Sequence, residues 1–395
     1  MNQNKKPVIM QILPALENGG VERGTIDIAK ALKKADFEPI VVSAGGILVY
    51  QLREAKITHI QLPVNKKNPF TIFSNIEKIA QLIEDHNVDI VHVRSRAPMW
   101  SAYFACKETN TKLISTIHGT YSLNFWKWKS FWLKKKYNEM MLKADKIIVV
   151  SNFIKNYLIE NYQNQKSDSK QNLFLEKITV IQRGADLNHF KSDIISKTRV
   201  IDLIHKWRIP EEKKIILMPA RFTAWKGHEF LIEALAKVKS DFYCAMVGSD
   251  HGHKKFRKKI EAKIVKENLE GKVGIVGVCK EMPVAYAMSH LVVCPSVKPE
   301  AFGRIAIEAQ AASKIIIATK IGGSLETIID GKTGFLVENG DVEKFAQLID
   351  HALTMSKSEV DVITSAARKN IEENFSNEKM CDETLRVYED VLAQG

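Results

Sequence analysis

The stretch LVVCPSVKPEAFGRIAIEAQAA, residues 291–312, contains a strand, a loop and a helix in quick succession. The apolar run 291–294 is typical of a buried strand, and Pro295 and Pro299 prevent that strand from continuing. Residues 306–312, rich in alanine, then favour a helix. Similar strand and helix segments alternate along most of the chain, and this alternation predicts parallel sheets with helices on both faces.

Two carboxylates lie at either end of this loop-to-helix junction. Glu300 directly precedes the predicted helix, and Glu308 lies within it, up to about 10 Å further along the helix axis. The pair can therefore bind opposite ends of one extended ligand. Acidic residues occupy 46 of the 395 positions, so the spacing alone equally fits two solvated surface acids.

Length and composition indicate two domains without a membrane span. At about 150 residues per domain, 395 residues predict two domains or slightly more. No apolar run approaches the roughly 18 residues of a spanning helix, and polar residues 1–7 lead directly into a strand, so we expect neither a span nor a secretion signal. The five cysteines lack metal-site spacing and fit a reduced, cytoplasmic compartment.

The positive charge is concentrated in the N-terminal half. Residues 1–190 contain 27 Lys and Arg against 17 Asp and Glu, a net charge of +10, whereas the remainder has 31 against 29, a net charge of +2. This asymmetry predicts an anionic partner for the first half, with anionic lipid and nucleic acid both compatible.

Two series of strands give the domain organisation. We expect the first series at 8–13, 39–43, 58–62, 90–93, 112–117 and 146–150, and the second at 213–219, 243–248, 273–276, 291–294, 314–318 and 334–337. Helices such as 21–34 and 73–84 lie between strands, and the polar stretch 160–176 predicts an exposed insertion loop. The pattern predicts an α/β fold of two doubly wound domains, residues 1–190 and 191–375, with a ligand cleft between them at the carboxyl ends of the strands.

Glycines follow several predicted strands. Gly19 and Gly20 follow the first strand and open the first long helix, where main-chain N–H groups can bind an anion. Gly322 and Gly323 stand in the same relation to a later helix. Simple turns explain either pair equally well, and the first pair lacks the Gly-x-Gly-x-x-Gly fingerprint of dinucleotide-binding proteins.

Three charged or titratable side chains lie in loops that follow predicted strands. His118 is the first residue after the strand 112–117. At this end of a strand an imidazole can contact a ligand hydroxyl, although a lone histidine is usually structural. Arg221 and Lys226 follow the strand 213–219, and we expect them to converge on a diphosphate unless they are solvated loop cations. No Asp-x-Asp metal pair lies at a strand end, so we expect cationic side chains instead of a metal ion.

An aromatic and basic segment, residues 124–137, includes three of the six tryptophans. It is typical of a helix that lies on an anionic membrane or binds an acceptor, but a core helix with a basic outer face has the same composition. No nucleic-acid-binding fold accompanies it, so we expect no nucleic-acid partner. The residues concerned are Trp126, Trp128, Lys129, Trp132, Lys134, Lys135 and Lys136.

Taken in order, these motifs resemble the retaining, nucleotide-sugar-dependent glycosyltransferases of family four, glycosyl transferases group 1, over nearly the whole chain. That family has the GT-B fold, in which two Rossmann-like domains face a central cleft and a C-terminal helix, here residues 376–395, crosses back to the first domain. The matching segments are Gly19-Gly20-Val21-Glu22, His118-Gly119, Val150-Ser151-Asn152, residues 181–186, Arg221 with Lys226-Gly227, residues 300–308, and Gly322-Gly323 with Glu326.

The resemblance implies a role for each matching residue. Arg221 and Lys226 would bind the donor diphosphate, Glu300 the donor-sugar hydroxyls and Glu308 the ribose hydroxyls. His118 would lie near the donor sugar. Phosphate and sugar would also be approached by the main chain of Gly19, Gly20, Phe302, Gly303, Arg304 and Ile305.

The resemblance also implies the reaction and its partners. The family transfers a sugar with retention, the leaving phosphate is thought to take the acceptor proton, and we expect no metal or cofactor beside the nucleotide-sugar donor. We expect a monomer, cytoplasmic or peripheral on the inner membrane, acting on a lipopolysaccharide or another envelope glycolipid or polysaccharide precursor. A non-catalytic nucleotide-sugar-binding protein and an enzyme that processes sugar nucleotides are the alternatives.

The sequence departs from the family pattern at two places. Arg183 stands where the family usually has asparagine before a glycine, and residues 311–314 lack the glycine usually found after the motif helix. Neither departure changes the proposed charged residues, so both concern details of donor binding.

Overall fold

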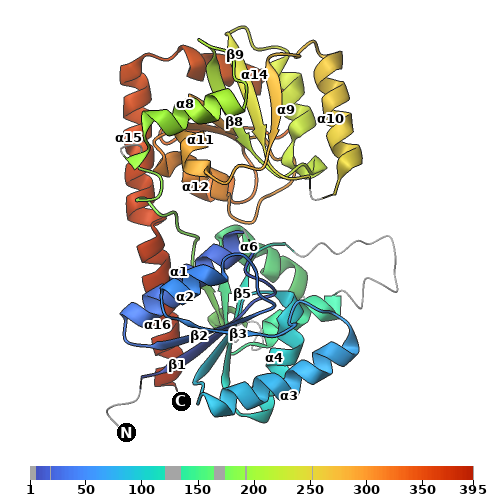
Figure 1. Cartoon of the computed structure of the whole chain (residues 1–395), viewed down its shortest axis with the longest axis vertical. Helices are drawn as coiled ribbons and strands as arrows, with labels where there is room; N and C mark the ends of the chain where they lie inside the picture. Colours follow the sequence, from blue (N-terminus) through green and yellow to red (C-terminus); the bar gives the residue numbers. More distant parts are fainter. Residues whose placement is uncertain are drawn as a thin grey trace. The chain divides into compact units, whose positions relative to one another are not determined.

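The computed structural model of the chain describes residues 6–17, 19–120, 135–163, 174–191, 194–250 and 252–394. The chain divides into two compact units (Figure 1). Unit 1 comprises residues 1–183 and 378–395, and unit 2 comprises residues 184–377. The first boundary predicted from the sequence, residue 190, lies slightly beyond this division.

Unit 1 is built on a parallel seven-stranded sheet of order β3-β2-β1-β4-β5-β6-β7. The strand order reverses at β1, as in a doubly wound α/β fold. The six strands predicted for the first series are all present, whereas the short β7 follows the polar stretch and was not predicted. The strands are β1 (Val8–Ile12), β2 (Glu38–Ser43), β3 (Thr58–Gln61), β4 (Ile90–Val93), β5 (Lys112–Ile117), β6 (Lys146–Val149) and β7 (Ile178–Val180).

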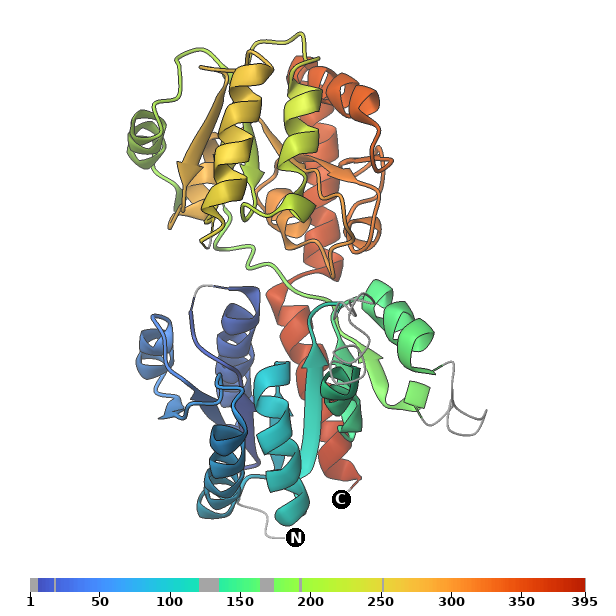
Figure 2. The ribbon, with the colours of Figure 1, turned by 90° about the vertical axis from the view of Figure 1, so that its right-hand side faces the viewer.

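The helices of unit 1 cover both faces of this sheet (Figures 1 and 2). α3 begins where Asn68 accepts a hydrogen bond from the main-chain N–H of Thr71, and Pro69 occupies the first helical position. The elements are α1 (Gly20–Lys34), α2 (Val49–Glu54), α3 (Pro69–Asp85), α4 (Arg96–Glu108), the 3₁₀ helix η1 (Met140–Lys143), α6 (Asn152–Leu158), the π-helical turn η2 (Ile159–Gln163) and α16 (Asn377–Ala393). Part of the predicted insertion loop therefore forms η2, and residues 164–173 of that loop lie outside the described residues.

The C-terminal helix α16 belongs to the core of unit 1, as the GT-B resemblance implied. Its buried residues, among them Leu385 and Tyr388, pack with Ile9 and Ile28. The Tyr388 hydroxyl hydrogen-bonds Nδ1 of His92 at 2.6 Å. Nε2 of the same ring lies 2.6 Å from the Thr116 hydroxyl, so buried polar contacts join α16 to strands β4 and β5.

Unit 2 repeats the architecture with a parallel six-stranded sheet of order β10-β9-β8-β11-β12-β13, and all six strands were predicted. The strands are β8 (Lys214–Pro219), β9 (Phe242–Val247), β10 (Val273–Gly277), β11 (Leu291–Cys294), β12 (Ile315–Thr319) and β13 (Phe335–Val337). The helices are α8 (Lys197–Lys206), η4 (Ala224–Lys226), α9 (His228–Leu235), α10 (Lys254–Lys266), α11 (Met282–Met288), α12 (Arg304–Ala311), α13 (Ser324–Thr327), α14 (Val342–Thr354) and α15 (Lys357–Asn374).

The strand directions place the candidate residues. Because the strands of each sheet are parallel, the loops that follow them gather at one carboxyl edge of that sheet.

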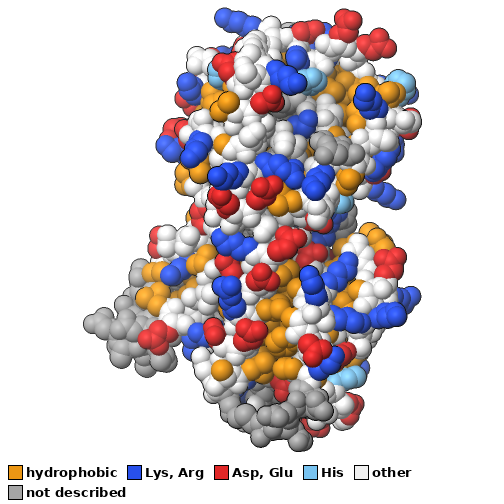
Figure 3. Space-filling model, turned by 90° about the vertical axis from the view of Figure 1, so that its left-hand side faces the viewer, with side chains coloured by type: hydrophobic (Ala, Val, Ile, Leu, Met, Phe, Trp, Pro, Cys, Tyr) orange, Lys and Arg blue, Asp and Glu red, His pale blue; other side chains and the backbone are white. Residues whose placement is uncertain are grey.

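Within the described ranges, no helix is long and apolar enough to cross a membrane. On the face shown in Figure 3, acidic and basic side chains are interspersed over unit 2, in keeping with the balanced charge of the second half of the chain.

Replacing Tyr388 by phenylalanine is expected to destabilise unit 1 by about 1–3 kcal/mol, because Nδ1 of His92 loses its partner in a buried site. Hydrogen exchange of α16 amides and the denaturation midpoint of unit 1 measure the change. Tyr50→Phe is the matched control, since this ring is 53% exposed, and its cost should stay below about 0.5 kcal/mol. Equal effects of the two variants would contradict the role given to the buried contact.

Candidate functional site

Loops after three strands of unit 2 meet at the carboxyl edge of its sheet. Arg221 follows β8, Glu300 follows β11 and Gly322 follows β12. The main chains of Glu300 and Gly322 form a parallel bridge, and the Gly323 N–H donates to the Glu300 carbonyl at 2.8 Å. Gly322 has a φ of 56°, and a Cβ there would lie 2.5 Å from the Glu300 carbonyl oxygen. Glycine is therefore required where the two loops touch.

A buried ion pair lies at the centre of this edge. Lys226 Nζ is 2.6 Å from Glu300 Oε1, and the two side chains are only 9% and 10% exposed. The Ser296 hydroxyl donates to the same oxygen at 2.5 Å, and the Cys294 thiol approaches it at 3.4 Å. Burial alone raises the pKa of Glu300, but Lys226 and these hydrogen bonds outweigh it and hold that pKa below its usual range. Glu300 is therefore a carboxylate near neutral pH.

The two cations predicted to converge do lie together. Lys226 Nζ is 4.3 Å from the centroid of the Trp225 ring, and the guanidinium carbon of Arg221 is 5.9 Å from the same centroid. Arg221 is exposed, whereas Lys226 is buried against Glu300. The Trp225 ring thus lies near both the exposed Arg221 and the buried Lys226.

Glu308 has its own set of partners on α12. Arg304 pairs with its Oε1 at 2.6 Å, and the Tyr286 hydroxyl donates to its Oε2 at 3.0 Å. The Tyr286 side chain is fully buried, so the orientation of the carboxylate is fixed from the interior. The two glutamates are therefore held by separate contacts, as two independent ligand contacts require.

The first turn of α12 lies between the two glutamates in sequence. Gly303 adopts the left-handed conformation, with a φ of 88°, and the helix begins at Arg304. The first N–H groups of a helix have no acceptor within it and favour a negative charge, and here they include that of Ile305. Phe302, in contrast, is buried against Phe375 with ring centroids 5.9 Å apart, so its side chain belongs to the core.

His118 lies at the carboxyl edge of the unit 1 sheet, directly after β5. Its Nε2 is buried and has no hydrogen-bond partner among the described residues. Burial lowers its pKa well below the usual value, and the neighbouring cations Arg183 and Arg94 lower it further. The imidazole is therefore neutral near pH 7 and can serve as a hydrogen-bonding group.

The start of α1 lies at the same edge. Gly19 precedes the helix in an extended conformation and Gly20 is its first residue. A guanidinium nitrogen of Arg183 donates to the Gly20 carbonyl. A Cβ on Gly24 would lie 2.8 Å from the Arg183 guanidinium carbon, so glycine leaves room for this side chain. The arginine that departs from the family pattern therefore supports the Gly19-Gly20 turn.

Several of these residues were not found from the sequence. Arg94 directly follows β4 and is 1% exposed, with Nη1 donating to Gln11 Oε1 at 3.2 Å. The strand-end argument that selected His118 would also have selected Arg94. Ser296, Cys294 and Tyr286 have no comparable signal, because only tertiary contacts bring them to the two glutamates.

The predicted membrane or acceptor segment is only partly described. Trp126, Trp128, Lys129, Trp132 and Lys134 lie outside the described residues. Lys136 is exposed, and Lys135 Nζ lies 6.0 Å from the centroid of the Tyr162 ring.

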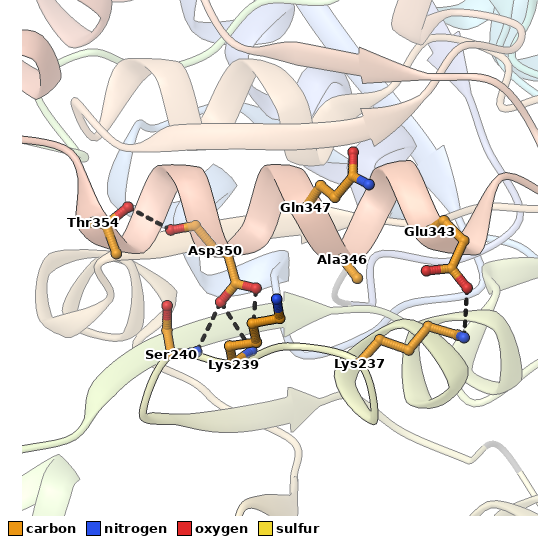
Figure 4. A pocket seen from close by; sticks show the side chains of 8 residues that line it. All are labelled: Lys237, Lys239, Ser240, Glu343, Ala346, Gln347, Asp350 and Thr354. Atoms are coloured by element: carbon orange, nitrogen blue, oxygen red, sulfur yellow. Dashed lines mark hydrogen bonds and ion pairs between the residues drawn. The ribbon is translucent and has the colours of Figure 1, made fainter.

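A groove of about 500 Å³ occurs elsewhere in unit 2 (Figure 4). The loop on one side of it precedes β9, so the groove lies at the amino edge of the sheet, away from Glu300. Asp350 accepts hydrogen bonds from the main-chain N–H groups of Lys239 and Ser240, and Lys237 pairs with Glu343 at 2.5 Å. These polar groups already bind one another, which disfavours the groove as the main ligand site.

The sequence of the chain matches two family models and several known proteins. The model of glycosyl transferases group 1 matches residues 201–369, and that of glycosyltransferase family 4 matches residues 18–189. The N-acetyl-alpha-D-glucosaminyl L-malate synthase of Bacillus anthracis is 26% identical over 96% of this chain and 95% of that protein.

Solved structures agree with these matches. A glycosyltransferase from Rickettsia africae is 42% identical, with 99% of this chain and 100% of that chain covered, and its TM-score is 0.87. HepE from Anabaena, solved with UDP-glucose, is 21% identical with 97% and 99% covered, and its TM-score is 0.81. The GT-B fold implied by the sequence resemblance is confirmed.

Replacing Lys226 by methionine is expected to destabilise unit 2 by about 3–5 kcal/mol near neutral pH, because the Glu300 carboxylate remains buried without its cation. With Lys226 absent, burial raises the pKa of Glu300 above its unfolded value, so the loss should shrink as the pH falls and the carboxylate takes up a proton. Denaturant unfolding at several pH values measures this.

Lys237→Met provides the control, since it breaks an exposed ion pair of similar length and should cost less than about 1 kcal/mol at any of these pH values. The double variant Lys226→Met/Glu300→Gln should recover part of the lost stability. A pH-independent loss in the single variant would contradict the buried carboxylate.

Proposed function

This chain belongs to the glycosyl transferases group 1 of family four, and from that premise we propose that it transfers a sugar from a nucleoside diphosphate sugar to an acceptor hydroxyl with retention of configuration. The observation that carries the proposal is the convergence of Arg221, Lys226 and Glu300 at one edge of unit 2. Together they offer positive charge for a diphosphate and a carboxylate for sugar hydroxyls.

The ion pair leaves Lys226 able to bind phosphate. An ammonium has three N–H donors, and one of them serves Glu300. We assign the diphosphate to Lys226, to the exposed Arg221 fork and to the N–H groups at the start of α12, near Gly303, Arg304 and Ile305. The structure of HepE with UDP-glucose supports a donor of this class.

The two glutamates take different parts of the donor. Glu300 is held at Oε1 by three donors, which leaves Oε2 for the sugar hydroxyls. Glu308 accepts the ribose hydroxyls, with Tyr286 maintaining the orientation of its carboxylate. Neither glutamate acts as the acid or nucleophile of a hydrolase.

We assign a positioning contact to unit 1. The neutral imidazole of His118 provides a hydrogen bond to the donor sugar, and Gly19 and Gly20 let the main chain before α1 approach it. Arg183 supports this turn through the Gly20 carbonyl.

The proposed reaction needs no side-chain base. The acceptor oxygen forms a bond to the anomeric carbon on the face from which the diphosphate leaves, while the bond from that carbon to the phosphate oxygen breaks. The departing phosphate oxygen takes the hydroxyl proton. Negative charge accumulates on the diphosphate, where Arg221 and Lys226 stabilise it more in the transition state than in the ground state.

The proposed acceptor is a lipopolysaccharide or another envelope glycolipid or polysaccharide precursor. The net charge of +10 in residues 1–190 supports an anionic acceptor or membrane surface. The protein would then act as a monomer in the cytoplasm or on the inner face of the membrane.

Turnover of a nucleoside diphosphate sugar is expected to give a product with the anomeric configuration of the donor. NMR of the first product formed determines that configuration.

Arg221→Met should lower kcat about 100-fold, because one cation that stabilises the leaving diphosphate is lost. Lys239→Met, at the opposite edge of unit 2, is the control and should leave kcat unchanged. An inverted product would contradict the proposed stereochemistry, and donor binding without any turnover would favour a non-catalytic protein.

Glu308→Gln tests the ribose contact separately. It should weaken nucleoside diphosphate binding about 10-fold, because the ribose hydroxyls lose a charged acceptor. Calorimetry with a nucleoside diphosphate and its 2′-deoxy form should show the wild type preferring the ribonucleotide and the variant losing most of that preference. Glu338→Gln, an exposed acid of unit 2, is the control, and an unchanged preference in Glu308→Gln would exclude the assignment.

A further inference from the structure

Helix α3 of unit 1 presents two phenylalanines to solvent. Phe70 is 88% exposed and Phe73 is 68% exposed, although phenylalanine is ordinarily buried. They lie three residues apart and therefore on the same side of the helix. The buried residues of α3 are Asn75, Ile79, Ala80 and Ile83, so other positions of the helix pack against the domain. Two such rings leave a substantial apolar area in water.

Helix α4 lies beside α3 and extends this surface (Figures 1 and 2). The Ser101 hydroxyl donates to the Ile72 carbonyl at 2.9 Å, which joins α4 to the turn that carries Phe70 and Phe73. Phe104 follows Ser101 by about one turn and is 42% exposed. We call the exposed side chains Phe70, Phe73, Phe104, Lys66 and Lys67 the α3–α4 surface.

The charge beside these rings is basic at the start of α3 and mixed further along, where the exposed Glu77 follows Phe73 by one turn and the exposed Glu108 follows Phe104 by one turn. Residues 55–76 contain three lysines and no aspartate or glutamate. Lys66 and Lys67 are exposed and lie immediately before α3. On α4, Lys107 Nζ lies 5.4 Å from the centroid of the Tyr103 ring. On the face of unit 1 in Figure 3, both acidic and basic side chains border the apolar patches.

We propose that the α3–α4 surface docks unit 1 on an anionic lipid bilayer, with Phe70 and Phe73 inserted at headgroup depth. Exposed aromatic rings beside lysines are suited to the interface of such a bilayer, since the rings enter the acyl boundary and each ammonium meets a lipid phosphate. A basic protein partner would be repelled by the lysines, and an uncharged one would gain nothing from them. Lys66 and Lys67 therefore favour an anionic partner, and the exposed rings of Phe70 and Phe73 beside them favour an anionic bilayer over an acidic protein.

The α3–α4 surface lies near the edge of unit 1 to which we assign the sugar contact. α3 follows β3 in a parallel sheet, so its first residues lie near the carboxyl edge, the edge that also carries His118. A bilayer bound there would present a lipid-linked acceptor to the edge of unit 1 where we place the sugar contact. This consequence rests on the proposed function, whereas the docking itself does not.

Sedimentation of the full chain with lipid vesicles tests the proposal. The wild type should bind phosphatidylcholine vesicles containing about 30% phosphatidylglycerol and should bind pure phosphatidylcholine at least about 10-fold more weakly. Phe70→Ser/Phe73→Ser should lower binding to the anionic vesicles at least about 10-fold, because both inserted rings are lost. Both positions are exposed, and thermal unfolding checks that the variant remains folded.

Further variants test the aromatic rings and the lysines of the α3–α4 surface separately, each against a control on unit 2. Val362→Ser removes an apolar side chain that is 71% exposed on unit 2 and should leave vesicle binding unchanged. Lys66→Glu/Lys67→Glu should weaken binding at low salt and much less at high salt. The control Lys254→Glu/Lys255→Glu makes the same charge change in exposed residues at the start of α10 and should have little effect.

Three results would overturn the docking proposal: no binding of anionic vesicles, binding that Phe70→Ser/Phe73→Ser leaves intact, or equal binding of neutral vesicles. If the chain self-associates and Phe70→Ser/Phe73→Ser abolishes this association, the surface binds a second copy of the chain. That result would also overturn the docking proposal. Donor turnover measured with a soluble acceptor should be the same in Phe70→Ser/Phe73→Ser and the wild type. Failure of vesicle binding with turnover intact would therefore leave the proposed function standing.

Discussion

A buried ion pair between Lys226 and Glu300 determines the arrangement of the carboxyl edge of unit 2. Removing two charges from water is costly, and a buried pair persists only where hydrogen bonds satisfy its remaining groups. Here the Ser296 hydroxyl and the Cys294 thiol contact the same carboxylate oxygen as the ammonium. The Thr319 hydroxyl in turn donates to the Ser296 carbonyl at 2.5 Å, so the loop after β11 is tied to the end of β12. The carboxylate is positioned before any ligand arrives.

The strand pattern of this protein was predictable because parallel sheets bury both faces of each strand. Every predicted strand appears in the structure, and the central ones, such as β11, are continuous buried apolar runs, whereas the edge strand β3 is polar and only half-buried. β7 was missed because its three residues follow a polar stretch and give no run of useful length. The return of α16 to unit 1 was inferred from the family resemblance, and contacts such as that of Tyr388 with His92 could not be anticipated from periodicity.

The candidate site was predictable where topology alone positions a side chain. The parallel strands of each sheet bring their following residues to one edge of that sheet, so His118 in unit 1 and Arg221 and Glu300 in unit 2 could be selected from the sequence. The partners that orient them depend on tertiary packing and leave no local pattern. The side chain of Phe302 packs on Phe375 in the core, so the donor contact predicted for this residue stays a prediction for its main chain.

The most direct measurement of the proposed donor site is a crystal structure of the chain with a nucleoside diphosphate sugar bound. We predict phosphate oxygens within hydrogen-bonding distance of Arg221 and Lys226, ribose hydroxyls on Glu308, and sugar hydroxyls on Glu300 with its contact to Lys226 retained. A nucleotide bound at the groove formed by Lys237 and Asp350, or one at the carboxyl edge whose phosphates touch neither cation, would contradict it.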